Sequence, residues 1–228
     1  MNRAICIIPA RGGSKRIPKK NIKRFSGKPI IEYSIIAAKE SGLFKEVIVS
    51  TDDNEIADIA IRLGASVPFF RSIKNSDDHS TTYDVIEEVL NKVEDNYDYV
   101  CCLYPCAPFV DSKKLIESFD KLVKRNLNCV FPIMEFNFPV QRALQCSGDI
   151  VSFVNPEYSL ARSQDLGKTF HDAGQFYFLR KDQLLLQKKL ITSNSGFLIV
   201  DEMEGQDIDN LVDWKLAEMK YEILQSTR

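Results

Sequence analysis

The stretch ICIIPARGGSKRIPKKN, residues 5–21, decides the fold of this chain. Its first residues are apolar and rich in β-branched side chains, which is typical of a strand buried on both faces of a sheet. The apolar run stops at Pro9 and gives way to glycine, serine and cations. We therefore predict a strand over residues 4–9 that delivers a basic loop to one edge of a sheet.

This loop has the composition of an anion-binding site. Gly12 and Gly13 lack a Cβ, so backbone N–H groups there can close around an anion. Arginine can bind phosphate as a fork and lysine as a point charge. The sequence matches neither GxxxxGK[ST] nor GxGxxG. We expect a polyphosphate ligand rather than a solvated basic turn, held by the cations Arg11, Lys15, Arg16, Lys19 and Lys20.

The rest of the chain alternates between strand and helix patterns, which indicates an α/β fold. We expect one domain over residues 1–228, with a three-layer, mostly parallel, doubly wound, Rossmann-like sheet. The expected strands after the first are 46–50, 99–103, 128–133, 175–179 and 196–200, with a short extended segment at 65–71. The expected helices are 29–41, 54–63, 82–93, 112–124 and 211–224.

Residues 136–170 break this alternation with prolines and scattered aromatic residues. We interpret them as an arm-like insertion of the same domain rather than as a second domain. Phe136 and Phe138 are of the kind that marks an interface when exposed, although core packing explains them equally well.

Composition excludes several classes of function. The chain has 228 residues and a formal net charge of −2, so general affinity for nucleic acid or anionic membranes is not expected. Its six cysteines include no CxxC pair and its histidines number two, which argues against structural zinc. No signal peptide and no run of eighteen apolar residues is present, so we expect a cytoplasmic protein with reduced thiols.

A pair of carboxylates precedes the last predicted helix. Asp207 and Asp209 lie at i and i+2, so in an extended segment they share one side while Ile208 points the other way. Such a pair suits a hard divalent cation, and Mg²⁺ is usually held by one or two carboxylates plus substrate phosphates. The alternative is capping of the helix by Asp209 and Asn210.

The basic loop also carries a family resemblance. IPARGGSKRIPKKN resembles the nucleotide-binding signature of the CMP-sialic acid synthetases, which are cytidylyltransferases. Within that family the chain resembles the branch for pseudaminic acid from end to end, through YPCAPF, EFNFPVQRAL, RSQDL, HDAGQFY and QDID. The resemblance implies that CTP and a nine-carbon 2-keto sugar acid react to give the CMP-sugar and pyrophosphate. It also implies a homodimer formed through the arm, and a product used in glycosylation such as that of flagellin.

The resemblance further implies roles for particular residues. The catalytic residues would be Arg11, Lys20, Asp207 and Asp209, with both aspartates on Mg²⁺ or another divalent cation. The nucleotide would contact Ala10, Arg11, Gly12, Gly13, Ser14, Asn21, Arg71, Thr81 and Thr82. The sugar acid would contact Tyr104, Arg162, Gln164, His171, Gln175 and Tyr177. Arg71, Thr82, Tyr104 and His171 each also admit a purely structural role.

Tyr104 departs from the family, whose members have glutamine at this position. This departure leaves the sugar acid open, with N-acetylneuraminate, legionaminate and the eight-carbon octulosonate as alternatives to pseudaminate. A nucleotide-sugar oxidoreductase would need GxGxxG after the first strand, which RGGSK does not supply. A non-catalytic nucleotide sensor is disfavoured by the Asp207–Asp209 pair.

Overall fold

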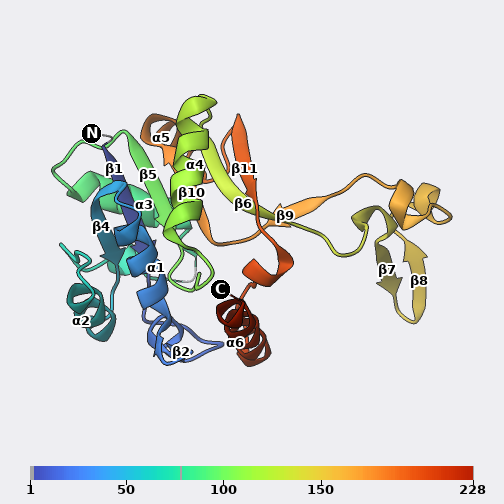
Figure 1. Cartoon of the computed structure of the whole chain (residues 1–228), viewed down its shortest axis with the longest axis horizontal. Coiled ribbons are helices and arrows are strands. Elements are labelled where there is room, and N and C mark those ends of the chain that lie inside the picture. The colour runs from blue at the N-terminus through green and yellow to red at the C-terminus, as the bar shows by residue number, and fades with distance from the viewer. Residues whose placement is uncertain (1–2, 78, 228) are drawn as a thin grey trace.

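The computed structural model describes residues 3–77 and 79–227. They form one seven-stranded sheet with helices on both faces and a long arm that projects from one end (Figure 1). The strands of this sheet are β1 (Ala4–Pro9), β4 (Phe44–Ser50), β5 (Tyr99–Leu103), β6 (Cys129–Glu135), β9 (Phe170–Asp172), β10 (Phe176–Arg180) and β11 (Ser195–Ile199). The helices are α1 (Ile30–Glu40), α2 (Asn54–Arg62), α3 (Thr82–Lys92), α4 (Ser112–Lys124), α5 (Lys181–Gln187) and α6 (Leu211–Ser226).

The sheet is mostly parallel, as predicted. Its strand order is β11-β6-β10-β5-β1-β4, and β9 pairs with β6. β1 lies between β4 and β5 and runs parallel to both, and β11 runs parallel to β6. β10 is antiparallel to both of its neighbours. Ligands of open α/β sheets bind at the carboxyl ends of such parallel strands, so the end of β1 is the expected place for a site.

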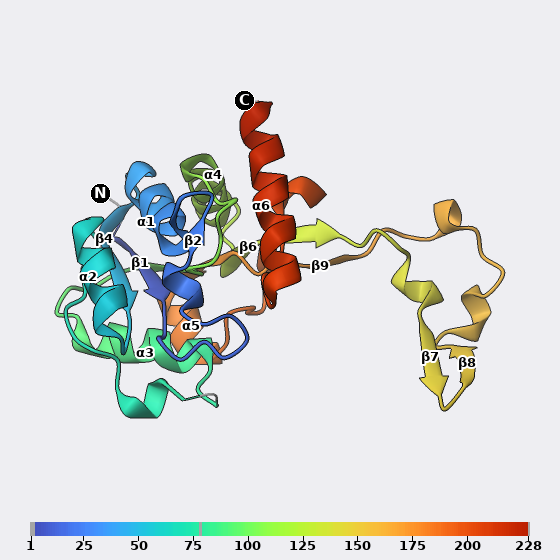
Figure 2. The same cartoon turned by 90° about the horizontal axis from the view of Figure 1, so that it is seen from below.

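Alternating side chains of the strands build the two cores. Cys6 and Ile8 of β1 face the layer that contains α1, α2 and α4. Ile5 and Ile7 face the opposite layer, which contains α3 and α5. This alternation is the physical basis of the predicted three-layer fold, and Figure 2 shows the helices on the two sides. Cys6, Cys101, Cys102 and Cys129 are buried and free, as expected of small apolar residues.

Helix α6 packs against the basic loop rather than on the sheet. Its Trp214 and Ala217 form a third core cluster with Ile17, Phe25 and Ile208. Phe25 and Trp214 meet edge to face, with ring centroids 5.7 Å apart. The end of the chain therefore returns to the loop with which the fold begins.

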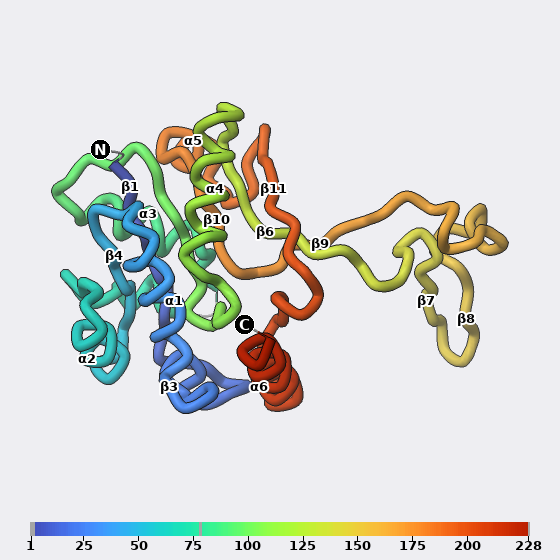
Figure 3. Tube along the Cα trace, in the orientation of Figure 1, coloured from blue at the N-terminus to red at the C-terminus, as the bar shows by residue number. Residues whose placement is uncertain are grey.

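The arm leaves the body at the end of β6 and returns through β9. These two strands pair antiparallel, from Ile133–Asp172 to Glu135–Phe170, so the outgoing and returning chains lie side by side (Figure 3). The tip carries a two-stranded hairpin, β7 (Leu144–Ser147) and β8 (Ile150–Phe153). No helix in the described part of the chain is long and apolar enough to cross a membrane.

Several short elements were not predicted. They are α5, β9, the arm hairpin, and the two-residue strands β2 (Arg24–Phe25) and β3 (Lys28–Pro29). The expected extended segment at 65–71 makes one isolated bridge, from Ser66 to Ile48, instead of a strand. Elements of two to seven residues contain too few turns or alternations to produce a recognisable period.

Candidate active site

The basic loop is fixed to the carboxyl edge of the sheet by its backbone. The Ala10 N–H donates to the Ser50 carbonyl of β4 at 2.9 Å. The Asn21 side chain donates to the Arg11 carbonyl at 2.8 Å, which closes the loop on itself. The Arg11 guanidinium crosses to the segment before α3 and donates to the Asp77 carbonyl at 3.0 Å. These hydrogen bonds fix the conformation of the loop relative to β4 and to the segment before α3.

Gly12 must be a glycine in this path. A Cβ at this position would lie 2.7 Å from the Asp53 carboxylate, which caps α2. The Gly12 N–H donates to Asp52 Oδ1 at 2.8 Å. A backbone N–H that donates to a carboxylate oxygen can also donate to a phosphate oxygen, as the composition of the loop predicts.

A first cavity, of about 210 Å³, lies beside this loop. Arg71 in its wall is 7 % exposed, and its guanidinium donates to both the carbonyl and the hydroxyl of Ser50. Burial lowers the pKa of Arg71, and the neighbouring Asp52 and Glu88 carboxylates oppose that shift. A buried cation in a cavity wall suits a ligand rich in acceptors. The predicted residues that line this cavity are Arg11, Arg71, Thr81, Thr82 and Tyr104.

The two threonines have different surroundings. Thr81 is the N-cap of α3 in a capping box with Asp84, so its hydroxyl already has a structural role. The Thr82 hydroxyl lies 3.4 Å from the Tyr104 hydroxyl. Burial raises the pKa of Tyr104, which keeps the phenol in its protonated form as a donor.

A second cavity, of about 320 Å³, lies on the other side of Tyr104. Its walls bring together Lys20 of the basic loop, Asp207 of the carboxylate pair, Asp172 at the end of β9, and Gly174 from the turn before β10. Tyr104 lines both cavities. The loop and the carboxylate pair, which are far apart in the sequence, therefore meet around one tyrosine.

The carboxylate pair has the predicted alternation. Ile208 is 2 % exposed and packs in the core cluster with Trp214, while Asp207 is exposed and Asp209 is half-buried. Arg16 forms an ion pair with Asp209 at 2.7 Å. Asn210, and not Asp209, is the N-cap of α6, in a capping box with Asp213. Neither aspartate is thus the helix cap; Asp207 is exposed, and Asp209 has the exposed Arg16 as its partner.

These residues fit a divalent cation that is completed by its substrate. Within residues 3–77 and 79–227, no three side chains of His, Cys, Asp or Glu gather into a cage for a metal. Asp207 and Asp209 could therefore supply only part of the coordination of a divalent cation, and substrate phosphates would have to supply further ligands, as is usual for Mg²⁺.

Two predicted sugar contacts, Gln175 just before β10 and Tyr177 within it, are buried. Tyr177 is buried and its hydroxyl donates to the Asp172 carboxylate. Burial and this carboxylate raise the pKa of Tyr177, so the proton stays on the phenol. Gln175 is 3 % exposed, and its amide donates to the Glu204 carbonyl at 2.6 Å rather than lining either cavity. His171 packs on Phe136, with ring centroids 4.8 Å apart, at the start of the arm.

The structure does not bring Arg162 and Gln164 to these cavities within one chain. Both lie in the outer part of the arm, where Arg162 pairs with Asp165 at 3.1 Å. Gln164 lines a separate cavity between the outgoing and returning chains of the arm, together with Phe136 and Pro139.

The sequence analysis did not single out Asp172 or Asp52. Asp172 accepts from the Gly174 N–H at 2.8 Å as well as from Tyr177, and it lines the second cavity. The available signal was its place two residues before a glycine in HDAGQFY. Asp52 precedes Asp53, the N-cap of α2, and its contact with Gly12 depends on the pairing of β1 with β4.

Comparison with known proteins agrees with this geometry. The model of the cytidylyltransferase family matches residues 5–212. The chain belongs to the cytidylyltransferase family. It is therefore an enzyme of this class, and the family predicted from the basic loop is confirmed.

Two relatives of this cytidylyltransferase match it over nearly its whole length. Pseudaminic acid cytidylyltransferase of Campylobacter jejuni is 40% identical over 224 residues, which cover 96% of this chain and 96% of the relative. CMP-N,N'-diacetyllegionaminic acid synthase of Legionella pneumophila is 31% identical over 235 residues, which cover 98% of each chain. The solved structure of CMP:2-keto-3-deoxy-manno-octonic acid synthetase complexed with CTP has a TM-score of 0.72. It covers 99% of this chain and 100% of its own, and at 19% identity it confirms the α/β fold.

Proposed function

We propose that this cytidylyltransferase couples CTP to pseudaminic acid, giving CMP-pseudaminic acid and pyrophosphate. The observation that carries the proposal is the pair of adjoining cavities with Tyr104 in both walls. One cavity holds the cations Arg11 and Arg71, and the other holds Lys20 and Asp207. A nucleotide in the first would present its α-phosphorus to a sugar acid in the second. The relative at 40% identity supports pseudaminic acid as that sugar acid.

The residues of the loop would hold the triphosphate. In this reaction the anomeric hydroxyl attacks the α-phosphorus in line and gives up its proton to water, a P–O bond to the β-phosphate breaks, and pyrophosphate leaves with its electron pair. Negative charge then accumulates on phosphoryl oxygens, and fixed donors stabilise it. Arg11 and Lys20 would contact the departing pyrophosphate, while Gly12, Gly13 and Ser14 would offer backbone N–H groups. Ala10, Asn21, Arg71, Thr81 and Thr82 would contact the nucleoside and the α-phosphate.

Asp207 and Asp209 would hold Mg²⁺ or another divalent cation. When bound, such an ion neutralises phosphate charge and lowers the pKa of a coordinated hydroxyl. Arg16 pairs with Oδ2 of Asp209, which leaves Oδ1 of the same carboxylate for a cation. Asp172, held by Tyr177 and Gly174, would accept hydrogen bonds from hydroxyl or amide groups of the sugar.

The arm supports a homodimer as part of this proposal. Two-stranded hairpins are at best marginally stable alone, yet β7 and β8 expose apolar side chains to solvent. A second subunit would cover them and receive Arg162 and Gln164 near its own sugar cavity, where the Arg162 guanidinium could bind the sugar carboxylate. His171, at the base of the arm, would orient it. The exposed apolar residues of the arm include Phe138, Leu144, Ile150, Val151 and Leu160.

The cell compartment belongs to the same proposal. The enzyme would act in the cytoplasm, where CTP is available and its free cysteines stay reduced. A relative from Campylobacter coli, 30% identical, is named post-translational flagellin modification protein B. By analogy, the product here would serve glycosylation of flagellin.

Pyrophosphate release with CTP and Mg²⁺ tests the proposal. Pseudaminic acid, legionaminic acid, N-acetylneuraminic acid and the eight-carbon octulosonate are supplied in parallel reactions. Turnover with pseudaminic acid well above the other three is the expected result. Preference for another acid would reassign the sugar and leave the CTP site in place. Absence of release with all four would refute the proposed reaction.

A further inference from the structure

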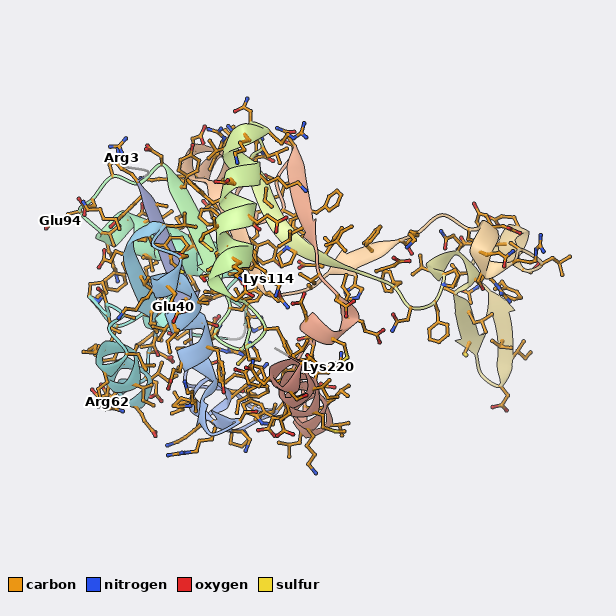
Figure 4. All side chains as sticks on the ribbon, in the orientation of Figure 1. Arg3, Glu40, Arg62, Glu94, Lys114 and Lys220 are labelled. Carbon is orange, nitrogen blue, oxygen red and sulfur yellow. The ribbon has the colours of Figure 1, made fainter. Side chains whose placement is uncertain are left out.

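Asp207 and Asp209 lie on a segment with little regular structure of its own. Residues 201–209 connect β11 to α6 and contain only one short 3₁₀ turn, Glu202–Glu204. Such a segment is held in place by contacts with its surroundings. Figure 4 labels two lysines that approach it from different elements, Lys114 of α4 and Lys220 of α6.

Lys114 fixes the side chain of Glu204. Lys114 is only 9 % exposed. Its ammonium lies 2.9 Å from Glu204 Oε1 and 3.1 Å from the Phe109 carbonyl oxygen. Asp111 is the third partner, at 3.8 Å. A buried ammonium is costly unless it keeps such partners, so Glu204 cannot leave it freely.

Gln175 fixes the backbone of the same residue. Its side-chain amide donates to the Glu204 carbonyl at 2.6 Å. Its own carbonyl accepts from the Tyr104 N–H at 2.9 Å. Gln175 therefore connects the wall shared by the two cavities to the segment that carries the aspartates.

Lys220 holds the turn from the opposite side. Its ammonium donates to the Glu202 carbonyl at 2.9 Å and to the Gly205 carbonyl at 3.0 Å. Gly205 itself is tightly placed, because a Cβ there would lie 2.7 Å from Met134 Sδ of β6. Beyond Asp207, the buried Ile208 anchors the segment beside Trp214.

We propose that Lys114, Gln175 and Lys220 are positioning residues that hold Asp207 and Asp209 in the arrangement that binds the divalent cation; this rests on the proposed function. None of the three needs to touch the metal or the substrate. Groups that hydrogen-bond a metal ligand directly change metal affinity about 10–100-fold when they are removed. These three side chains act on Glu202, Glu204 and Gly205, just before the aspartates, so we expect effects at the lower end of that range. Gln175 is thereby a connection between the sugar cavity and the metal-binding segment, instead of the sugar contact that the sequence suggests.

The test compares the Mg²⁺ concentration needed for activity by the wild type with that needed by Lys114→Met, Lys220→Met and Gln175→Leu. Pyrophosphate release is measured against Mg²⁺ concentration with saturating CTP and sugar acid. Independently, Mn²⁺ is titrated with CTP alone while the fluorescence of Trp214, the single tryptophan of the chain, is followed. Lys114→Met, Gln175→Leu and Lys220→Met are each expected to raise the half-saturating concentration of both cations about 10-fold or more.

Matched controls separate positioning from folding. Lys121→Met removes an α4 lysine that donates to the Phe197 carbonyl, and Lys215→Met removes an exposed α6 lysine. Both are expected to keep the wild-type cation requirement. Lys220→Met changes a side chain at the surface of α6, so it tests the proposal even if a core variant fails to fold.

Two outcomes overturn the proposal. The first is that the variants fold and need the same cation concentration as a wild-type enzyme that depends on Mg²⁺. The other is a Gln175→Leu enzyme in which only the KM for the sugar acid rises, which would make Gln175 a substrate contact. A wild type that needs no divalent cation would instead refute the metal assignment in the proposed function, and this proposal with it.

Discussion

Arg16 of the basic loop forms an ion pair with Asp209 of the carboxylate pair at 2.7 Å. The first loop of the chain and the segment before its last helix are therefore in direct contact. Both partners are partly exposed, so the pair contributes little to stability and can open when a ligand competes for either group. We interpret it as a link between two halves of one site.

Asp207→Asn and Asp209→Asn should each lower turnover about 10²–10³-fold, the loss typical of removing one electrostatic group from a reacting centre. Each variant removes a charge from the proposed metal-binding pair without changing its size. The measurement is kcat for pyrophosphate release over a range of Mg²⁺ concentrations. Asp120→Asn, on the exposed surface of α4 where Asp120 pairs with Lys124, serves as the control. Aspartate variants with wild-type turnover at low Mg²⁺ would remove the pair from the reaction.

Arg11→Ala should lower turnover about 10²–10³-fold, because Arg11 lines the nucleotide cavity and would contact the charge that develops on pyrophosphate. Arg62→Ala on the surface of α2, labelled in Figure 4, is the matched control and should behave as wild type. The comparison uses initial rates at saturating CTP and sugar acid. Near-normal turnover of Arg11→Ala would exclude it from the mechanism.

Glu88 should make the wall of the nucleotide cavity sensitive to acid. The Glu88 side chain is 9 % exposed, and burial alone would raise its pKa. Hydrogen bonds from Lys92, Asn75 and Ser72 outweigh burial and lower the pKa of Glu88 to about 2. The folded-state pKa lies below the ordinary value of 4.5, so this stabilisation is complete above pH 4.5 and is lost as the pH falls toward 2.

Glu88→Gln checks this assignment. Above pH 5 the variant should be less stable than the wild type by about 1.5–3 kcal/mol, the usual contribution of hydrogen bonds to a charged group. The difference in the free energy of unfolding should shrink progressively below pH 4.5. A difference independent of pH between 3 and 7 would show that the charge of Glu88 does not matter.

Ile150→Glu should dissociate the proposed dimer and reduce activity. Ile150 is 74 % exposed on the arm hairpin, so the change is harmless in a monomer but places a charge in an apolar interface. Sedimentation velocity and pyrophosphate release are measured together. Leu186→Glu, on the exposed side of α5, is the control and should leave both unchanged. A dimeric, active Ile150→Glu enzyme would place the interface elsewhere.

The main strands and helices could be predicted from the sequence because the central strands are buried on both faces of the sheet. Residues 4–9 and 99–103 are apolar runs bounded by turn signals, and both are strands with those limits. The helix ends followed from local chemistry: Asp53, Thr81 and Asp111 are N-caps as their residue types indicate. Such signals act over a few residues and need no tertiary information.

The contacts that build the site depend instead on the assembled sheet. Gly12 meets Asp52 because β1 pairs with β4. Gln175 looks like a cavity residue from the alternation of β10, yet its side chain is directed to Glu204, which no sequence period relates to it. Arg162 lies in the outer part of the arm and lines neither cavity of its own chain. Pairings between distant segments were therefore the part that sequence patterns could not predict.

Identifying the product tests the central claim most directly. Wild-type enzyme is incubated with CTP, Mg²⁺ and pseudaminic acid, and the nucleotide product is isolated and analysed by mass spectrometry and ³¹P NMR. The proposal predicts a single phosphodiester that joins CMP to the sugar acid, formed in equal amount to the released pyrophosphate. Pyrophosphate accompanied by free CMP, with no sugar-linked nucleotide, would contradict it.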